Sequence, residues 1–169
     1  MKLIPLTQGL VTLVDDGDYE GLVKFKWYAH RGRQTFYAIR NCGKPSGERN
    51  TVYMHRLILN APNSLMVDHV DGDGLNNQNV NLRICSYAEN IRNQRVLNRG
   101  NTTGYRGVSP CHPGGGYRAT IQLNRKQVHL GVFSSALKAS RAFDEAARKY
   151  FGAFYRPIKM EELLCRKET

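Results

Sequence analysis

One short stretch of the chain, residues 67–78, combines residue types that can hold a metal ion and move a proton. It reads VDHVDGDGLNNQ, with Asp68 and His69 adjacent. Carboxylate and amide oxygens suit hard cations such as magnesium, and histidine is the side chain that can act as a base near neutral pH. A cation-dependent phosphodiesterase needs both groups at one reaction centre, so this stretch is the first candidate for chemistry.

The charge around this stretch differs from that of the rest of the protein. The 169 residues carry 25 Lys+Arg and 14 Asp+Glu, a formal net charge of +11, yet three aspartates and no basic residue lie between Leu57 and Leu82. A basic protein favours a polyanionic partner, because neutralising phosphates releases condensed counterions. Nucleic acid is the first expectation and an anionic membrane surface the second. Without a cation the aspartates would repel a phosphate backbone, so the pattern favours a bound metal.

Other elements must bring these side chains together. Adjacent side chains on an extended segment point to opposite faces, so Asp68 and His69 need a distortion or a partner element to reach one centre. A brief strand is predicted at 82–85. The sequence SYAE at 86–89 then fits a capping box, which places a helix start there and Asn90 in or just past its first turn.

The order of residues from Asp68 to Asn90 resembles the HNH nucleases, specifically the His-Asn-Asn subgroup found among intron-encoded and free-standing phage endonucleases. The similar region begins at about Met54 and contains the DH pair, a Gly-rich loop, Asn-Leu-Arg from Asn81, and Ser-x-x-x-Asn. The resemblance implies a ββα-metal motif, in which two strands and a helix surround one divalent cation. It also implies hydrolysis of DNA, by nicking or by double-strand cleavage, in a homing-type or free-standing phage enzyme.

Residue roles follow from the resemblance position by position. It implies that Asp68 and Asn90 hold the cation and that His69 is the general base that activates water. Asn81 is implied to fix the loop by hydrogen bonding. The expected cation is Mg²⁺ or Mn²⁺, because the amide oxygen of Asn is a neutral ligand. Arg83 is expected to contact phosphate, with an ordinary surface position as the alternative.

Alternatives to this interpretation stay open. A calcium loop is disfavoured, since position twelve from Asp68 is Asn79 and an EF-hand has Glu there. Asp71 and Asp73 suit a turn, and His55 is expected to pack in the leading helix. A degenerate motif in a DNA-binding regulator that does not cut DNA is the alternative function. The cysteines form no C-x-x-C pair, so no zinc site is predicted; they are Cys42, Cys85, Cys111 and Cys165.

The last part of the chain predicts a separate DNA-binding module. Residues 99–169 contain 13 basic and 5 acidic side chains. Strands are predicted at 105–109, 117–123 and 127–133, followed by a helix from about 135 to 150. The motifs YRGV, LGVF and AFDEAA resemble the plant ethylene-response-factor (apetala-two) domain over about residues 104–154. The resemblance implies a three-stranded antiparallel sheet in the DNA major groove, backed by one helix.

Outward side chains of this sheet are the predicted DNA contacts, although such residues can also merely solvate an exposed sheet. The predicted contacts are Arg106, Arg118, Thr120, Gln122, Gln127 and His129.

The sequence as a whole predicts an α+β protein. Its predicted parts are a β-rich N-terminal module at 1–53, the ββα-metal motif at 54–98, a linker at 99–104, the DNA-binding domain at 105–156 and a tail at 157–169. No apolar run long enough to cross a membrane occurs, so the expected location is the cytoplasm of a bacterial or phage-infected cell. The expected partner is double-stranded DNA, bound by a monomer or homodimer. The nuclease interpretation requires Asp68 and Asn90 to share an ion and solvent to reach His69.

Overall fold

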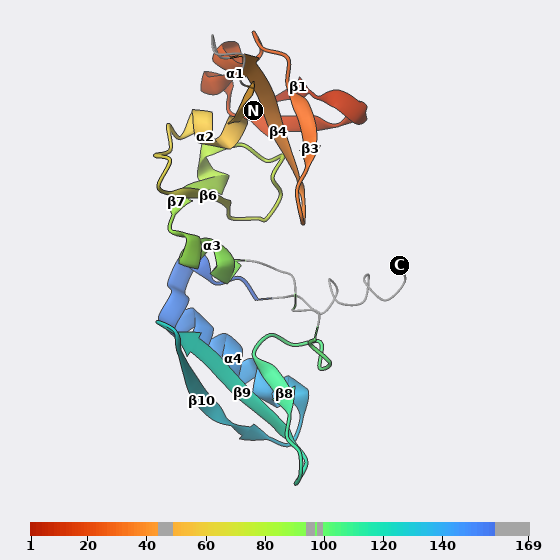
Figure 1. The fold of residues 1–169 in the computed structure, drawn as a ribbon, viewed down its shortest axis with the longest axis vertical. Helices are drawn as coiled ribbons and strands as arrows, with labels where there is room; N and C mark the ends of the chain where they lie inside the picture. The colour runs from red at the N-terminus through yellow and green to blue at the C-terminus, as the bar shows by residue number, and fades with distance from the viewer. Residues whose placement is uncertain (44–48, 94–96, 98–99, 158–169) are drawn as a thin grey trace. The chain divides into compact units, whose positions relative to one another are not determined.

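The computed structural model describes residues 1–43, 49–93, 97 and 100–157 (Figure 1). The chain divides into two compact units, Met1–Asn93 and Gln94–Thr169. Both units mix helices with small antiparallel sheets, as the sequence predicts. Within the described residues no helix has the length and apolar character that crossing a membrane would require.

The first unit begins with a two-stranded and a three-stranded antiparallel sheet. In chain order its first elements are β1 (Lys2–Pro5), η1 (Thr7–Gly9), β2 (Val11–Val14), α1 (Asp16–Leu22), β3 (Tyr28–Arg31), β4 (Phe36–Gly43) and β5 (Arg49–Tyr53). β4 lies between β3 and β5. The predicted N-terminal module is therefore β-rich with one short helix.

The core of the first unit extends from these sheets into the next helix. α2 (Met54–Ile58) begins directly after β5, and Met54 is fully buried. Met54 packs in one cluster with Trp27 and Val14, and the Trp27 indole donates a hydrogen bond of 2.8 Å to the Leu22 carbonyl. Since buried apolar area stabilises a fold in proportion to its size, residues 1–53 and the start of the HNH-like region stabilise each other.

Two strands and a helix follow in the first unit. β6 (Met66–His69) pairs antiparallel with β7 (Leu82–Cys85), and η2 (Asn79–Asn81) leads into β7. The helix α3 (Tyr87–Asn93) comes next. The predicted capping box is confirmed: the Glu89 carboxylate accepts a bond of 2.8 Å from the Ser86 amide, and the Ser86 hydroxyl accepts one of 3.3 Å from the Glu89 amide.

The second unit is a three-stranded antiparallel sheet packed on one helix. Its elements are β8 (Val108–Pro110), β9 (Tyr117–Leu123), β10 (Lys126–Phe133), α4 (Ala136–Phe151) and η3 (Gly152–Phe154). Ala119 and Ile121 are buried against the helix side, where Phe143 lies, while Arg118 and Gln122 are exposed. The alternation therefore gives the sheet one apolar and one polar face, as predicted from the period of two.

The first strand of this sheet starts later than predicted. Residues 105–107 were expected in the strand, but β8 begins at Val108. Gly107 has a φ of +68°, which places it in the left-handed region, and an added Cβ would overlap the Phe143 ring. Glycine is the residue that accepts both conditions, so the chain turns at Gly107 before the strand begins.

Candidate functional site

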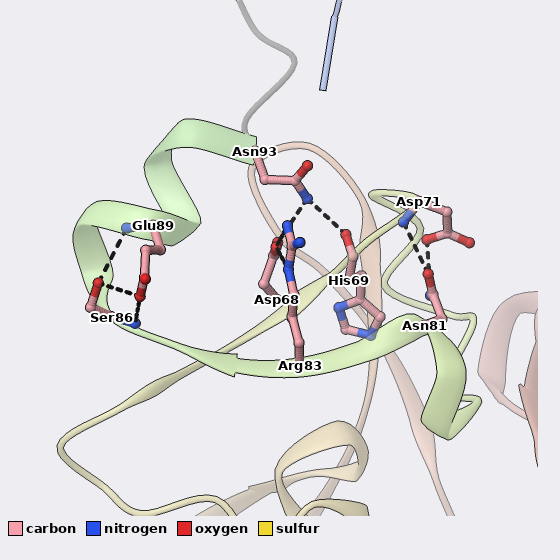
Figure 2. A network of polar contacts seen from close by, with 8 residues as sticks. All are labelled: Asp68, His69, Asp71, Asn81, Arg83, Ser86, Glu89 and Asn93. Carbon is pink, nitrogen blue, oxygen red and sulfur yellow. Dashed lines mark hydrogen bonds and ion pairs between the residues drawn. The ribbon is translucent and has the colours of Figure 1, made fainter. Parts of the chain in front are cut away.

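Asp68 lies buried at the centre of a polar network between β6, β7 and α3 (Figure 2). Its strand partner is Arg83, whose Nε donates to Asp68 Oδ2 at 2.8 Å and whose Nη2 also pairs with that oxygen. The other oxygen, Oδ1, accepts a hydrogen bond of 2.9 Å from Asn93 Nδ2. Both carboxylate oxygens therefore already face donors, one of them a cation.

Asn93 is the side chain of α3 that joins Asp68 to the next residue. Its Nδ2 also donates to the His69 carbonyl oxygen at 3.0 Å, and the residue is 7% exposed. Asn93 thus joins the Asp68 side chain to the His69 backbone, while the His69 ring points the other way, as expected for adjacent strand residues. Figure 2 shows the Asn93 amide above both residues.

His69 is held in a buried aromatic environment. The residue is 5% exposed, and its ring centroid lies 5.0 Å from that of His55 and 5.9 Å from that of Tyr37. Burial lowers the pKa of His69, although the Asn77 hydrogen bond and the nearby aspartates act in the opposite direction. The ring is therefore biased towards the neutral form, which a general base requires. Its burial differs from the expectation that solvent reaches His69.

His55 packs as predicted for the leading helix. Its ring lies nearly perpendicular to that of His69, at 86°, and contacts the Tyr37 and Tyr53 rings. Burial is the main cause that lowers the pKa of His55 to about 3, with His69 and Arg56 adding repulsion. Its buried Nδ1 has no hydrogen-bond partner among the residues that the structure describes.

Asn81 ties the two ends of the loop that joins β6 to β7. Its Oδ1 accepts from the Asp71 amide at 2.9 Å, and its Nδ2 donates to Asp71 Oδ1 at 2.9 Å and to the Asn76 carbonyl at 2.8 Å. Asp71 and Asp73 cap turns of the same loop by accepting backbone hydrogen bonds. The loop is thus held by its own polar side chains.

Asn90 and Arg83 are the two remaining predicted residues of this unit, and their partners in the structure differ. Asn90 is half-buried in the first turn of α3, where its backbone N–H donates to the Ser86 carbonyl at 3.0 Å. No hydrogen bond in the described part of the chain joins the Asn90 side chain to Asp68. Arg83 pairs with the Asp68 carboxylate and has 17% of its side chain exposed; its contact with phosphate stays a prediction. Asn90 as a cation ligand stays a prediction, and the amide that reaches Asp68 is that of Asn93.

The sequence interpretation did not include Asn93, Asn77 or Thr12. Asn93 follows Asn90 by three residues, a spacing that puts both on one side of a helix, so the pattern alone could have included it. Asn77 and Thr12 are fully buried and hydrogen-bond to each other at 2.7 Å. The two residues are 65 positions apart in the sequence, so no local sequence pattern predicts this contact.

The predicted DNA contacts of the second unit fall into two groups. Gln127 pairs with Gln122 and His129 with Thr120 across β9 and β10, so these side chains share one face with Arg118. Arg118, Gln122, Gln127 and His129 are exposed, and Thr120 is half-buried.

Arg106 lies apart from this face. It is half-buried near Asp144 and Tyr155, and burial lowers the pKa of its guanidinium against the opposing effect of these two groups. The Tyr155 hydroxyl donates to the Asp144 carboxylate. Arg106 therefore lies half-buried beside this partly buried pair, and its contact with DNA stays a prediction.

Comparison with known proteins gives one relative. No protein-family model matches the chain, and no solved structure is significantly similar to it. The chain is 27% identical over 140 residues to a protein of Acanthamoeba polyphaga mimivirus that is named an uncharacterized HNH endonuclease; the aligned region covers 82% of this chain and 69% of the relative. This similarity supports an HNH endonuclease family.

Proposed function

We propose that the protein is a cation-dependent endonuclease that hydrolyses phosphodiester bonds of double-stranded DNA. The observation that carries the proposal is that Asn93 of α3 hydrogen-bonds both the Asp68 carboxylate and the His69 backbone carbonyl, which ties β6, β7 and α3 into one ββα unit. The relative named as an HNH endonuclease supports the same class of reaction. The net charge of +11 favours a polyanionic substrate.

The donor set fits a hard divalent cation such as Mg²⁺ or Mn²⁺. Asp68 would supply a carboxylate oxygen and Asn90 an amide oxygen, the ligand types that such cations prefer, whereas Asn93 turns its NH₂ end to Asp68 and would orient that carboxylate. The Arg83 guanidinium is paired with Asp68, so a divalent ion would have to displace it from the carboxylate. When bound, the ion would stabilise charge on the phosphate and the leaving 3′-oxygen.

His69 takes the proton in this proposal. Burial lowers the pKa of its imidazole, which favours the neutral ring, and a neutral ring nitrogen accepts a proton from water as the water attacks phosphorus. Arg83 would be free to contact the phosphate once a divalent ion replaces it at Asp68, which unites its predicted role with its observed partner.

The sheet of the second unit is proposed to hold the DNA. A small antiparallel sheet fits the major groove, where base edges differ in their donors and acceptors. The five side chains of one face include donors and acceptors from Arg118, Thr120, Gln122, Gln127 and His129. Arg106 is not part of this face, because it precedes β8 and lies near Asp144 and Tyr155.

A second candidate function is DNA binding without cleavage. Two observations favour it: His69 is 5% exposed, which restricts the approach of water, and Arg83 already neutralises Asp68. The two candidates differ in whether divalent ions convert bound DNA into cut DNA.

A plasmid assay separates the candidates. Supercoiled DNA carrying random genomic fragments is incubated with the full chain in Mg²⁺, in Mn²⁺ or in chelator, and retention is followed in a gel. We expect cutting only with the metals. His69→Ala should cut roughly 10²- to 10⁴-fold more slowly while retaining DNA, whereas His30→Ala, at an exposed position of β3, should cut normally. Normal cutting by His69→Ala removes the base assignment. Retention without cutting by the wild type supports the second candidate.

A further inference from the structure

A buried line of hydrogen bonds connects His69 to the N-terminal strand β2. His69 Nε2 lies 3.2 Å from Asn77 Oδ1, and Asn77 Nδ2 donates to Thr12 Oγ1 at 2.7 Å. The Thr12 hydroxyl in turn donates to the Leu75 carbonyl oxygen at 2.7 Å. The line therefore runs from the ring, through the loop and β2, to a backbone acceptor.

The Leu75 carbonyl, at the end of this series of hydrogen bonds, determines which group donates in each bond. A backbone carbonyl can only accept, so the single proton of the Thr12 hydroxyl points to Leu75. The Thr12 oxygen must then accept from Asn77, which requires the NH₂ end of that amide. The carbonyl end faces His69 and can only accept, so His69 must donate from Nε2–H.

The surroundings leave little room for another arrangement. Thr12 and Asn77 are each 0% exposed. Backbone bonds hold the same segments together, since the Leu13 amide donates to Leu75 at 2.9 Å and the Asn77 amide donates to Leu13 at 2.8 Å. Asp15 adds a further tie, because its carboxylate accepts from the Asn79 amide at 2.8 Å. The amide of Asn77 is thus oriented by contacts that exclude water.

We infer that Asn77 and Thr12 are positioning residues that hold His69 in its Nε2–H tautomer and leave Nδ1 as the atom that accepts the proton from water. The inference rests on the proposed nuclease function for the use of Nδ1, whereas the tautomer follows from the hydrogen bonds alone. It gives residues 1–53 a part in the chemistry through Thr12, beyond support of the fold.

Substitution of Thr12 tests the inference with a matched pair of variants. Thr12→Ser keeps the hydroxyl and should behave as the wild type. Thr12→Val keeps the shape and removes the hydroxyl, so the Asn77 amide loses the contact that sets its direction and can turn its NH₂ end to the ring. An Nδ1–H tautomer of His69 then becomes accessible. Trp27 fluorescence reports whether each variant is folded, since Trp27 is the single tryptophan and lies in the core of this unit.

The first readout is the tautomer itself. Nitrogen-15 NMR of the His69 ring is recorded on the full chain, without DNA or metal, at about pH 8, above the ordinary histidine pKa. The wild type and Thr12→Ser should show the Nε2–H form, and Thr12→Val a mixture with the Nδ1–H form. A wild-type ring that is predominantly Nδ1–H overturns the inference, whether or not Thr12→Val folds.

The second readout is cleavage. Thr12→Val should lose about tenfold or more in kcat with an unchanged KM, because a fraction of the rings presents a proton where a lone pair is needed. An unchanged tautomer and kcat in folded Thr12→Val overturns the positioning role. A wild type that has the Nε2–H form but never cuts DNA preserves the assigned tautomer and removes the proposed nuclease, so the two failures are distinguishable.

Discussion

Replacing His55 with leucine should reduce the amount by which the free energy of unfolding of the first unit falls on acidification. His55 is 7% exposed, and its pKa is lowered to about 3 chiefly by burial, from an ordinary value of 6.5. Between pH 6.5 and pH 3, His55 binds a proton in the unfolded chain but stays unprotonated in the folded protein. The contribution of neutral, buried His55 to the free energy of unfolding is therefore complete above pH 6.5 and declines as the pH falls towards 3.

The magnitude follows from the separation of the two pKa values. Each pH unit inside this window costs about 1.4 kcal/mol for one proton, so His55 should account for a loss of about 2 kcal/mol at pH 5 relative to neutral pH. His69 contributes a slope of the same sign, because its pKa is also lowered. The difference between wild type and His55→Leu isolates the part that belongs to His55.

The assay is urea unfolding followed by the fluorescence of Trp27. This tryptophan is 2% exposed and shares a core cluster with Met54, the neighbour of His55. Free energies of unfolding are measured at about pH 7.5, 6 and 5 for the wild type, His55→Leu and the surface control His30→Leu. His30→Leu should keep the wild-type loss, while His55→Leu should lose about 2 kcal/mol less on acidification. An equal loss in all three proteins would show that folded His55 takes up the proton freely, and would refute the argument from burial.

Two further predictions concern the second unit and the cation. Gly107→Ala should destabilise the second unit by about 3 kcal/mol or more, since the new Cβ would overlap the Phe143 ring and the backbone φ is +68°. Gly104 has a φ of +77° but open space around it, so Gly104→Ala should cost only about 1 kcal/mol. Thermal unfolding by circular dichroism compares them, and equal losses would exclude the steric explanation. Asn93→Ala should weaken Mn²⁺ binding measured by calorimetry more than Asn90→Ala, because Asn93 orients the Asp68 carboxylate; the reverse order would show that Asn90 contributes more than this orientation.

The parts of the fold with local signals could be predicted from the sequence. The capping box at Ser86 and Glu89 depends on four consecutive residues, and it forms as expected. The polar and apolar faces of β9 follow from strict alternation along one strand. The start of β8 could not be located, since the requirement for Gly107 comes from Phe143, a contact made only after the sheet and helix pack.

The candidate site shows the same division between local and tertiary information. Asp68 and His69 are recognisable as a pair because they are adjacent. Arg83 as the partner of Asp68 depends on the register of β6 and β7, which two strands of four residues each do not specify by themselves. The tautomer inferred for His69 depends on Thr12 through Asn77, and only the folded chain brings Thr12 near.

The core that Met54 shares with Trp27 limits how this protein can be divided or recombined. An excised peptide spanning only residues 54–98 would expose the buried side of α2 and lose the β2 contacts to the loop. Transfer of the ββα unit to a foreign scaffold therefore requires that β2 be transferred with it. A gene rearrangement that replaces residues 1–53 would have to keep a strand with threonine at the position of Thr12, or supply another acceptor for the Asn77 amide.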